Sequence, residues 1–303
     1  MTHREFTLLA EGYGFMKTYF TKPMCLKCDD NDSFRLVWDA KAEFPFAKSI
    51  AVLVFPYPAF DVNERIPAYY LASNKAYFSV KKLIEELANR GVRAEKANIS
   101  VKKQLILSGI GNQCRSSLVS IKGYGTRCVI LALAIDTLDP LEYDERDAPC
   151  GSCTKCADAC PTGAITSEGM DYRRCLRFAL EELPHGDEAK MLQKTYIGCE
   201  ICQYACPRNA RANGHEVGSE IREAFDTARL VSGDCASARK LVGKNMTGGG
   251  KLTAEAISMA ARDEDDFFTR FKEELAKAES SEFEAVGDAI RFAKELIGKE
   301  HEK

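Results

Sequence analysis

Residues 150–161 have the sequence CGSCTKCADACP, in which four cysteines spaced C-x2-C-x2-C-x3-C are followed directly by a proline. Three cysteines on one tight loop can reach three corners of an iron–sulfur cubane, whereas the fourth, turned by the proline, reaches a second cluster. Thiolates are soft ligands that suit such clusters. Zinc is the alternative, but zinc loops usually pair two C-x2-C hairpins across a longer gap. The stretch therefore predicts 4Fe–4S clusters.

A second motif, C-x2-C-x3-C-P, begins at Cys199 and ends at Pro207. Aligned on the first motif, it has Tyr196 where the opening cysteine would stand. In two-cluster ferredoxins the last cysteine of each motif ligates the other cluster. This rule predicts that cluster 1 takes Cys150, Cys153, Cys156 and Cys206, and that cluster 2 takes Cys160, Cys199 and Cys202.

Cluster 2 lacks a fourth ligand in this scheme, and Cys175, which lies between the motifs, is the best candidate. If Cys175 is instead an inert buried cysteine, cluster 2 would be a three-iron or open-site cluster. Cys25 and Cys28 form a single C-x2-C, which we interpret as an incidental pair rather than a redox or metal site. The other cysteines are interpreted first as packing residues: Cys114, Cys128 and Cys235.

Composition limits the class of protein. The chain has 303 residues, 45% hydrophobic and 29% charged, which predicts about two domains with an adequate core. Its net charge of −3 does not indicate a dominant nucleic-acid surface. Thirteen cysteines and only four histidines favour cluster ligands over disulfides or a histidine-rich metal site. With no secretory segment and no apolar run long enough to cross a bilayer, a cytoplasmic protein without membrane contact is expected.

Three regions are predicted along the chain. Residues 1–144 mix helix and strand patterns, residues 145–213 hold the cysteine motifs, and residues 214–303 are helical and charged. In the first region we expect a buried strand at 49–55 and a helix at 69–90, with Tyr77 and Phe78 facing the core. A second helix is expected at 101–107. Residues 117–121 and 127–135 are predicted to pair as a hairpin.

The third region is predicted to contain two amphipathic helices, at residues 263–277 and 281–297. A run of three glycines occupies residues 248–250 between two lysines. A phosphate cradle is one interpretation, but the run lacks the Walker spacing. We therefore interpret it as a flexible linker.

The cysteine motifs and their neighbours resemble the ferredoxin module of epoxyqueuosine reductases. The resemblance covers residues 150–165, Arg173-Arg174-Cys175 and residues 198–207. This family uses an isolated cysteine at the position of Cys175 as a cluster ligand, so the resemblance implies the same role here. Upstream, residues 108–126 are similar in length and glycine placement to the segment that precedes the module in the family.

The resemblance implies an α+β fold class with a nitroreductase-like, cobalamin-type domain at residues 1–144. A central bacterial ferredoxin-like module with two 4Fe–4S clusters and a C-terminal helical region would follow. It implies a cobalamin-dependent reductase whose clusters pass electrons to cobalt, supplied by a donor such as ferredoxin or flavodoxin. A base-off cobalamin without a histidine ligand is expected, and the scarcity of histidines is compatible with it.

Site residues follow from the same resemblance. The family's catalytic aspartate falls on Glu95, so Glu95 is the expected proton donor; a solvated glutamate at a strand end is the alternative. Gly109, Gly111, Arg115 and Tyr124 are the expected cofactor-binding residues. A surface ion pair is the alternative for Arg115, and a turn aromatic is the alternative for Tyr124.

The chain also departs from the family pattern. The Gly-Lys-Asn triplet becomes Cys114-Arg115-Ser116, and an Asp-Tyr-His stretch becomes Ala76-Tyr77-Phe78. These changes motivate an alternative hypothesis, a corrinoid-free iron–sulfur electron-transfer protein with an N-terminal docking domain. The substrate stays open: tRNA is possible, but the net charge does not favour it.

Overall fold

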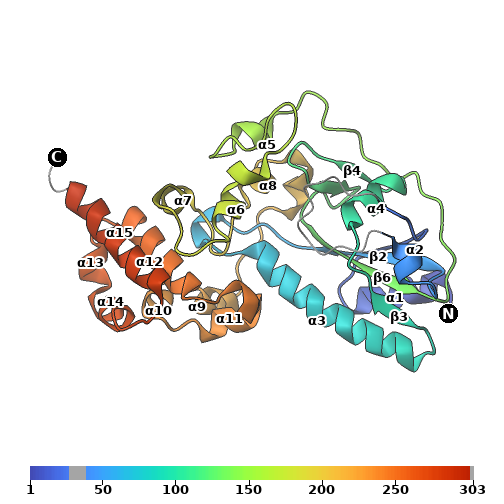
Figure 1. Cartoon of the computed structure of the whole chain (residues 1–303), viewed down its shortest axis with the longest axis horizontal. Helices are drawn as coiled ribbons and strands as arrows, with labels where there is room; N and C mark the ends of the chain where they lie inside the picture. The colour runs from blue at the N-terminus through green and yellow to red at the C-terminus, as the bar shows by residue number, and fades with distance from the viewer. Residues whose placement is uncertain (27–38, 301–303) are drawn as a thin grey trace. The chain divides into compact units, whose positions relative to one another are not determined.

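The computed structural model describes residues 1–26 and 39–300, and it separates into two compact units (Figure 1). Unit 1 comprises Met1–Pro58, Ala72–Cys153 and Pro207–Ala212. Unit 2 comprises Ala59–Leu71, Thr154–Cys206 and Asn213–Lys303. Helices and sheets are both present, which confirms the mixed α+β class. Within the described ranges, no helix combines the length and the apolar character needed to cross a membrane.

Unit 1 is built on a four-stranded antiparallel sheet with the strand order β1-β2-β6-β3. Its strands are β1 (Lys17–Thr21), β2 (Ser49–Pro56), β3 (Ala94–Lys96) and β6 (Cys128–Ile135). The continuous apolar run of β2 is explained by burial on both faces, because every residue from 49 to 55 is buried. The predicted strand at 49–55 is confirmed.

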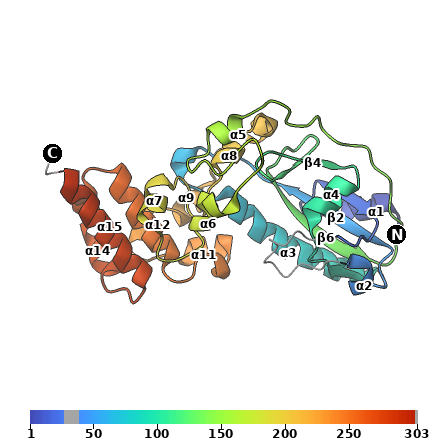
Figure 2. The ribbon, with the colours of Figure 1, turned by 45° about the horizontal axis from the view of Figure 1, so that its top comes forward.

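Helices cover both faces of this sheet. Ile50, Val52 and Val54 of β2 share a core cluster with Leu105 of α4 (Val101–Leu107). Helix α3 (Ala68–Asn89) runs along the other side of the sheet (Figures 1 and 2). Two shorter helices complete unit 1: α1 (His3–Gly12) and α2 (Ala40–Glu43). The predicted helices at 69–90 and 101–107 are both confirmed.

The orientation predicted for Tyr77 and Phe78 is wrong. Their side chains are 41% and 54% exposed, whereas Val80, Leu83 and Leu87 of the same helix are buried. Residues 80, 83 and 87 follow the helical period and form its inner face, and residues 77 and 78 fall outside it. The Lys81 ammonium lies 4.5 Å from the centre of the Tyr77 ring, so this part of the helix surface is aromatic and basic.

The predicted hairpin between residues 117–121 and 127–135 is also wrong. Strand β5 (Val119–Ile121) pairs with β4 (Gly111–Gln113) in a separate two-stranded sheet. Strand β6 instead pairs with β2 and β3. The turn between β5 and β6 does form, with the Ile121 N–H donating to the Gly125 carbonyl. The strands separate because the apolar β6 gains two neighbours and burial in the main sheet.

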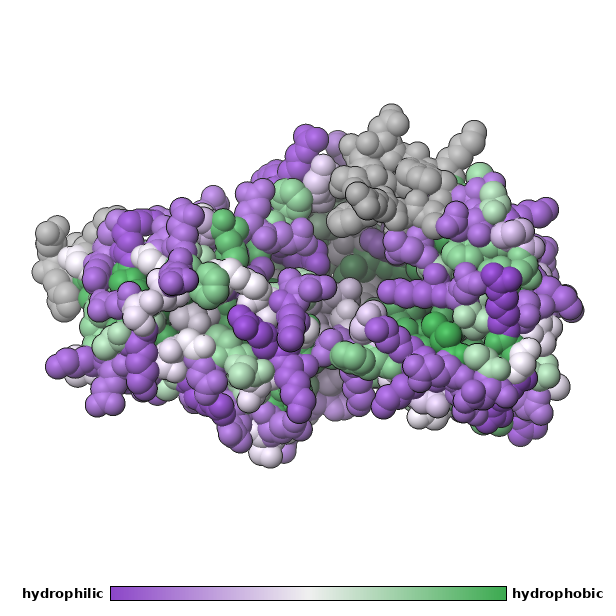
Figure 3. All heavy atoms as spheres, turned by 60° about the horizontal axis from the view of Figure 1, so that its bottom comes forward, coloured by the Kyte–Doolittle hydropathy of each residue, from purple (hydrophilic) through white to green (hydrophobic). Residues whose placement is uncertain are grey.

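Unit 2 is largely helical, and α12 (Lys251–Asp263) is its most buried helix. Helix α12 packs against α10 (Thr227–Val231) and α15 (Glu284–Glu300). Other helices of this unit are α7 (Asp187–Leu192), α9 (Ser219–Ala224) and α11 (Ala236–Val242). The helix predicted at 263–277 is broken in the structure into α13 (Phe267–Arg270) and α14 (Lys272–Ala278). Hydrophilic side chains dominate the face drawn in Figure 3.

The glycine run at 248–250 is a packed turn, so its interpretation as a flexible linker is wrong. Gly250 precedes α12 with φ +74°, a left-handed conformation. A Cβ atom there would lie 2.8 Å from Phe283 Cβ and 2.8 Å from Val286 Cγ2. Only glycine allows both this backbone conformation and this close approach to the start of α15.

Substituting Gly109 by alanine is expected to destabilise unit 1 more than the same change at Gly91. Both residues have φ near +75°, so the left-handed backbone costs about 1–2 kcal/mol in each variant. A Cβ on Gly109 would lie 2.2 Å from the Tyr143 carbonyl oxygen, whereas nothing lies within 4 Å at Gly91. Overpacking adds about 1–3 kcal/mol. Urea unfolding of both variants measures the difference, and equal losses would contradict the close approach.

Candidate iron–sulfur centre

The cysteine motifs lie on very short helices joined by turns. Helices α5 (Lys155–Asp158), α6 (Leu176–Ala179) and α8 (Ile201–Tyr204) have four residues each. Cys156 lies on α5 and Cys202 on α8, while Cys175 directly precedes α6 and follows a 3-10 turn at Tyr172–Arg174. The C-x2-C and C-x3-C spacings place neighbouring thiols three or four residues apart, so that they lie on one side of a short helical turn.

The four cysteines predicted for cluster 2, which are Cys160, Cys175, Cys199 and Cys202, all belong to unit 2. Burial raises the pKa of Cys199 and of Cys202 to about 12. Repulsion from neighbouring thiolates, among them Cys160 and Cys175, raises both pKa values further. Such repulsion weakens with distance, and it is consistent with four thiolates that bind one cluster. Iron would reverse the balance, since it binds and stabilises the deprotonated thiolates.

Cys160 has a different environment. Burial raises the pKa of its thiol, but hydrogen bonds from Thr162 and from the backbone of Ala164 and Ile165 outweigh burial and lower it. The Cys160 Sγ lies 3.6 Å from the Thr162 Oγ1. Hydrogen bonds to ligand sulfurs are one of the factors that set cluster reduction potentials. The lowered pKa therefore favours the thiolate form of Cys160, which is the form that binds iron.

The four cysteines predicted for cluster 1 are divided between the units. Cys150 and Cys153 belong to unit 1, and Cys156 and Cys206 belong to unit 2. Cys150 and Cys153 share a turn in which the Cys153 N–H donates to the Cys150 carbonyl at 3.1 Å. Among the His, Cys, Asp and Glu residues that the structure describes, no group of three or more is arranged to hold a single metal ion. A 4Fe–4S cluster does not require several ligands to converge on one metal ion, because each of its irons takes its own thiolate.

Arg115 holds this first cysteine turn in place. Its Nε donates to the Cys153 carbonyl at 3.1 Å, and its Nη2 donates to the Gly151 carbonyl at 3.1 Å. The planar guanidinium can bind two carbonyls at once, which an ammonium group cannot do with the same geometry. The surface ion pair considered for Arg115 stays an alternative beside these backbone contacts. Its predicted role in binding a cofactor stays a prediction.

Replacing Arg115 by alanine is expected to reduce the occupancy of cluster 1. The variant loses two hydrogen bonds from a charged donor, each worth about 1.5–3 kcal/mol. Arg115→Lys should retain an intermediate amount of iron, because an ammonium replaces the two-pronged contact with a single one. Iron and sulfide analysis measures the result. Arg146→Ala is the control, since Arg146 also donates to a carbonyl, that of Ile106, which does not belong to a cysteine motif. Equal iron loss in both variants would contradict the role of Arg115.

A second group of unit 1 residues, which the sequence did not reveal, holds the segment after Cys206. Asn209 is 1% exposed, and its side chain exchanges hydrogen bonds with Thr126. Arg208 pairs with Asp147 at 3.3 Å. The segments that follow Cys206 and precede Cys150 are therefore both bound to the region around β4 and β5. A polar residue two positions beyond the Cys-Pro pair was the only available sequence signal.

The other predicted site residues have identifiable places in unit 1. Glu95 lies on the edge strand β3, where its side chain is 46% exposed and pairs with Arg93 at 2.7 Å. This position matches the solvated strand-end alternative. Gly111 makes room for Val119, since an added Cβ would lie 2.5 Å from the Val119 Cγ1. The Tyr124 hydroxyl donates to the Met16 carbonyl at 3.2 Å. Catalytic and cofactor roles for these residues remain predictions.

The remaining cysteines divide into buried and exposed positions. Cys114, Cys128 and Cys235 are buried, as their interpretation as packing residues requires. Burial raises the pKa of Cys128 to about 12, which keeps its thiol protonated. Cys25 is exposed, and Cys28 lies outside the described residues.

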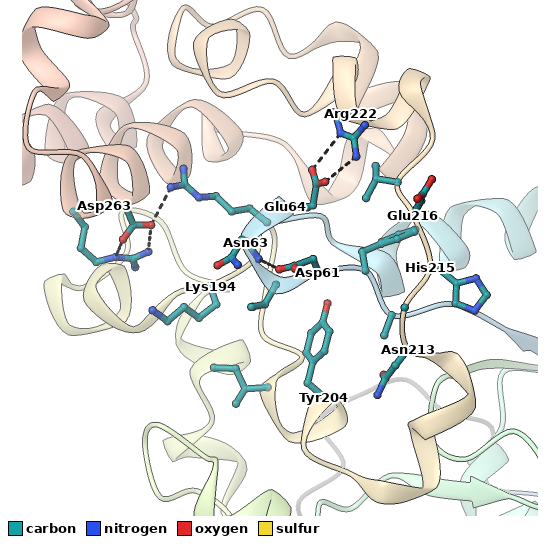
Figure 4. Close-up of a pocket in the computed structure, with 18 residues that line it drawn as sticks. Asp61, Asn63, Glu64, Lys194, Tyr204, Asn213, His215, Glu216, Arg222 and Asp263 are labelled. Carbon is teal, nitrogen blue, oxygen red and sulfur yellow. Dashed lines mark hydrogen bonds and ion pairs between the residues drawn. The ribbon is translucent and has the colours of Figure 1, made fainter.

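A pocket of about 1200 Å³ lies within unit 2, lined in part by Ile201 and Tyr204 of α8 (Figure 4). Four acidic side chains and four from lysine or arginine line it. Arg222 pairs with Glu64 at 2.8 Å, and Asp263 accepts from Arg65 at 3.0 Å. The lining therefore has no excess charge of either sign. None of the predicted cluster ligands, all of which lie in the described ranges, lines the pocket, although two of its lining residues belong to α8, the helix that carries Cys202.

Comparison with known proteins first defines the class of this centre. Residues 149–209 match the family model described as a 4Fe-4S double cluster binding domain. The match covers all eight predicted ligands from Cys150 to Cys206. The segment is thus a double-cluster iron–sulfur domain, which confirms that part of the prediction.

Curated relatives match about half of this chain. It is 30% identical to the epoxyqueuosine reductase of Cyclobacterium marinum over 192 residues, which cover 56% of this chain and 61% of that protein. It is 34% identical to that of Bacillus subtilis over 153 residues, which cover 48% of this chain and 36% of that protein. The chain thus spans less than two thirds of the length of these curated relatives.

Solved structures give the fold. The structure of epoxyqueuosine reductase from Streptococcus thermophilus matches with a TM-score of 0.69 at 20% identity, covering 98% of this chain and 90% of that one. A structure of epoxyqueuosine reductase with an epoxyqueuosine-modified tRNA-Tyr stem loop matches with a TM-score of 0.66 at 18% identity, covering 97% and 98%. The chain resembles epoxyqueuosine reductases in sequence and shares their fold, as the motifs predicted.

Proposed function

We propose that this chain is an iron–sulfur oxidoreductase with two 4Fe–4S clusters. Cluster 1 takes Cys150, Cys153, Cys156 and Cys206, and cluster 2 takes Cys160, Cys175, Cys199 and Cys202. The match of residues 149–209 to a double-cluster domain carries the proposal. Repulsion from the Cys175 thiolate, which contributes to the raised pKa values of Cys199 and Cys202, supports its assignment as the fourth ligand of cluster 2. The clusters would supply one-electron transfer between a donor, such as ferredoxin or flavodoxin, and an acceptor.

The chain's own residues support this electron path in two ways. Arg115 fixes the turn that carries Cys150 and Cys153. Hydrogen bonds from Thr162 and neighbouring amides favour the thiolate of Cys160. Two clusters in contact only conduct electrons, so the reaction itself needs a further site. The similarity to epoxyqueuosine reductases supports a reductase, in which we propose three regions: an α+β domain at residues 1–144, a double-cluster domain at 145–213 and a helical region at 214–303.

Cobalamin is the acceptor that the family resemblance implies. The residues expected to bind it do not show a fit: Arg115 and Tyr124 donate to backbone carbonyls, Gly109 and Gly111 make room for neighbouring protein atoms, and Glu95 is paired on an exposed edge. These observations favour the second candidate, a corrinoid-free iron–sulfur electron-transfer protein with an N-terminal docking domain. We assign no chemical step to cobalt.

Anaerobic purification of the full chain, with and without added cobalamin, tests both candidates. Iron and sulfide analysis should give about eight irons per chain from two cubanes. A value of about four would overturn the ligand scheme for cluster 2. Cobalt analysis and the visible spectrum decide between the candidates: a corrinoid that co-elutes supports the cobalamin-dependent reductase, and its absence supports the electron-transfer protein.

The substrate is a separate question. One similar solved structure contains an epoxyqueuosine-modified tRNA stem loop, which makes tRNA the first substrate to test. The net charge of −3 does not favour a nucleic acid over the whole surface. Complementation of a queuosine-deficient strain tests the activity directly. Failure to complement, despite good expression and full iron content, would remove tRNA epoxide reduction.

A further inference from the structure

Helix α12 carries an unusual buried polar stripe. Lys251, Glu255 and Arg262 are spaced i, i+4 and i+11, which places them on one face of the helix. Their side chains are 8%, 0% and 9% exposed. Charged residues are almost never this buried unless they are paired. The groups that pair with these charged side chains therefore indicate their role.

Glu255 binds the loop that leads to Cys199. Its Oε2 accepts from the Ile197 N–H at 2.8 Å, two residues before Cys199. Its Oε1 lies 3.1 Å from the Nε2 of His185, a side chain that is also buried. The other ring nitrogen of His185 lies 2.7 Å from the Glu182 carbonyl oxygen. One carboxylate oxygen of Glu255 thus lies against His185, and the other binds the loop that precedes Cys199.

The loop that Glu255 holds is strained. Ile197 has φ +59°, a left-handed conformation that is a genuine outlier for a β-branched residue. Such conformations persist only where the surroundings enforce them, and they concentrate at functional sites. Thr195 Oγ1 donates to the Gly198 carbonyl at 3.1 Å and closes the turn. The Glu255 carboxylate is therefore part of what holds the backbone that presents Cys199.

Lys251 binds the segment that follows Cys175. Its Nζ donates to the Leu180 carbonyl and lies 4.0 Å from the Glu255 Oε1. Leu180 is fully buried and belongs to a small apolar cluster against which Cys199 packs. Two oppositely charged side chains of α12 thus bind backbone groups near cluster 2 cysteines: Glu255 binds the segment before Cys199, and Lys251 binds the segment after Cys175. Electrostatic interactions are strong at such buried positions and are little screened by salt.

We propose that Glu255 and Lys251 are positioning residues that fix the ligand loops of cluster 2 and tune its reduction potential from α12. The inference rests on the proposed function, because it requires cluster 2 to be bound. Reduction adds negative charge to the cluster. The Glu255 carboxylate therefore disfavours reduction and lowers the potential, whereas the Lys251 ammonium favours reduction and raises it.

Two variants that keep a polar side chain test the proposal. Glu255→Gln retains an acceptor for the Ile197 N–H but removes the negative charge, so the potential of cluster 2 should rise. Lys251→Gln retains a donor for the Leu180 carbonyl but removes the positive charge, so the potential should fall. Anaerobic redox titration of the full chain, followed by EPR, measures both clusters; Cys175→Ser identifies the signal of cluster 2. The potential of cluster 1 should move less in both variants.

Matched controls come from two exposed residues of α14: Glu273→Gln and Lys272→Gln make the same charge changes and should leave both potentials unchanged. Shifts of opposite sign confined to cluster 2 support the proposal. Unchanged potentials in both α12 variants, or shifts of the same sign, would overturn it. If Glu255→Gln does not assemble cluster 2, the Lys251→Gln variant alone tests the proposal: a lower potential of cluster 2 supports it, and an unchanged or higher potential overturns it. Iron analysis of the wild-type protein comes first. If it shows that cluster 2 is absent, the proposed function is refuted rather than the role of Glu255 and Lys251.

Discussion

Alanine at position 175 is expected to lower the iron content of the anaerobically prepared protein from about eight to between about four and seven atoms per chain. Cys175 is the proposed fourth ligand of cluster 2, so its removal would leave this cluster with three thiolates. A cubane with one unligated iron either loses that iron or disassembles. Iron and sulfide analysis measures the loss, and EPR of the oxidised protein distinguishes a three-iron cluster from an empty site.

Cys235→Ala is the matched control for this substitution. Cys235 is buried, and its Sγ lies 3.4 Å from the Thr253 Oγ1 in the helical part of unit 2. We expect this control to keep about eight irons, with only the small stability loss of a buried thiol. Full iron content and an unchanged EPR spectrum in Cys175→Ala would show that Cys175 is an inert buried cysteine.

Removal of iron by a chelator under anaerobic conditions is expected to unfold the cysteine module while the sheet of unit 1 persists. Helices α5, α6 and α8 have four residues each, too short to be stable alone. The local apolar cluster contains only Leu176, Leu180 and Ala189 as buried members. Modules with so little core derive their folding free energy from the bound metal.

Hydrogen exchange followed by mass spectrometry measures this effect separately for each segment. Peptides from residues 155–179 and 199–206 should lose protection when iron is removed. Peptides from β2 and β6 should keep it, because these strands pair over their full length and are buried between helices. Equal protection of the cysteine segments with and without iron would show that the protein fold alone holds them.

Local patterns in the sequence were reliable where short-range geometry decides the result. The strand at 49–55 and the helices near 69–90 and 101–107 follow from their apolar patterns and turn residues. The double-cluster domain follows from cysteine spacing, because a cubane restricts which residues of a tight loop can bind it. The same spacing left cluster 2 one ligand short, and Cys175, 24 residues before Cys199, is the predicted fourth ligand because it lies between the motifs and the family resemblance supports it.

Partner choice between distant segments could not be predicted in the same way. Residues 119–121 and 128–135 have strand patterns and a turn between them, yet β6 pairs with β2 and β3. Pairing depends on which strands compete for the buried positions of the sheet, and periodicity contains no such information. The outward orientation of Tyr77 and Phe78 has the same origin, since the inner face of α3 is set by the sheet that it covers.

The sequence by itself determined the class of the redox centre, because two cysteine motifs have the spacing of a double-cluster domain, and ligand chemistry and loop length are local properties. Only the tertiary structure decided what supports them. Arg115 binds the first cysteine turn, and Glu255 binds the loop before Cys199 from a helix 58 residues beyond its bonding partner. Such contacts form because buried charges and backbone groups need hydrogen-bond partners, and the fold alone brings those partners together.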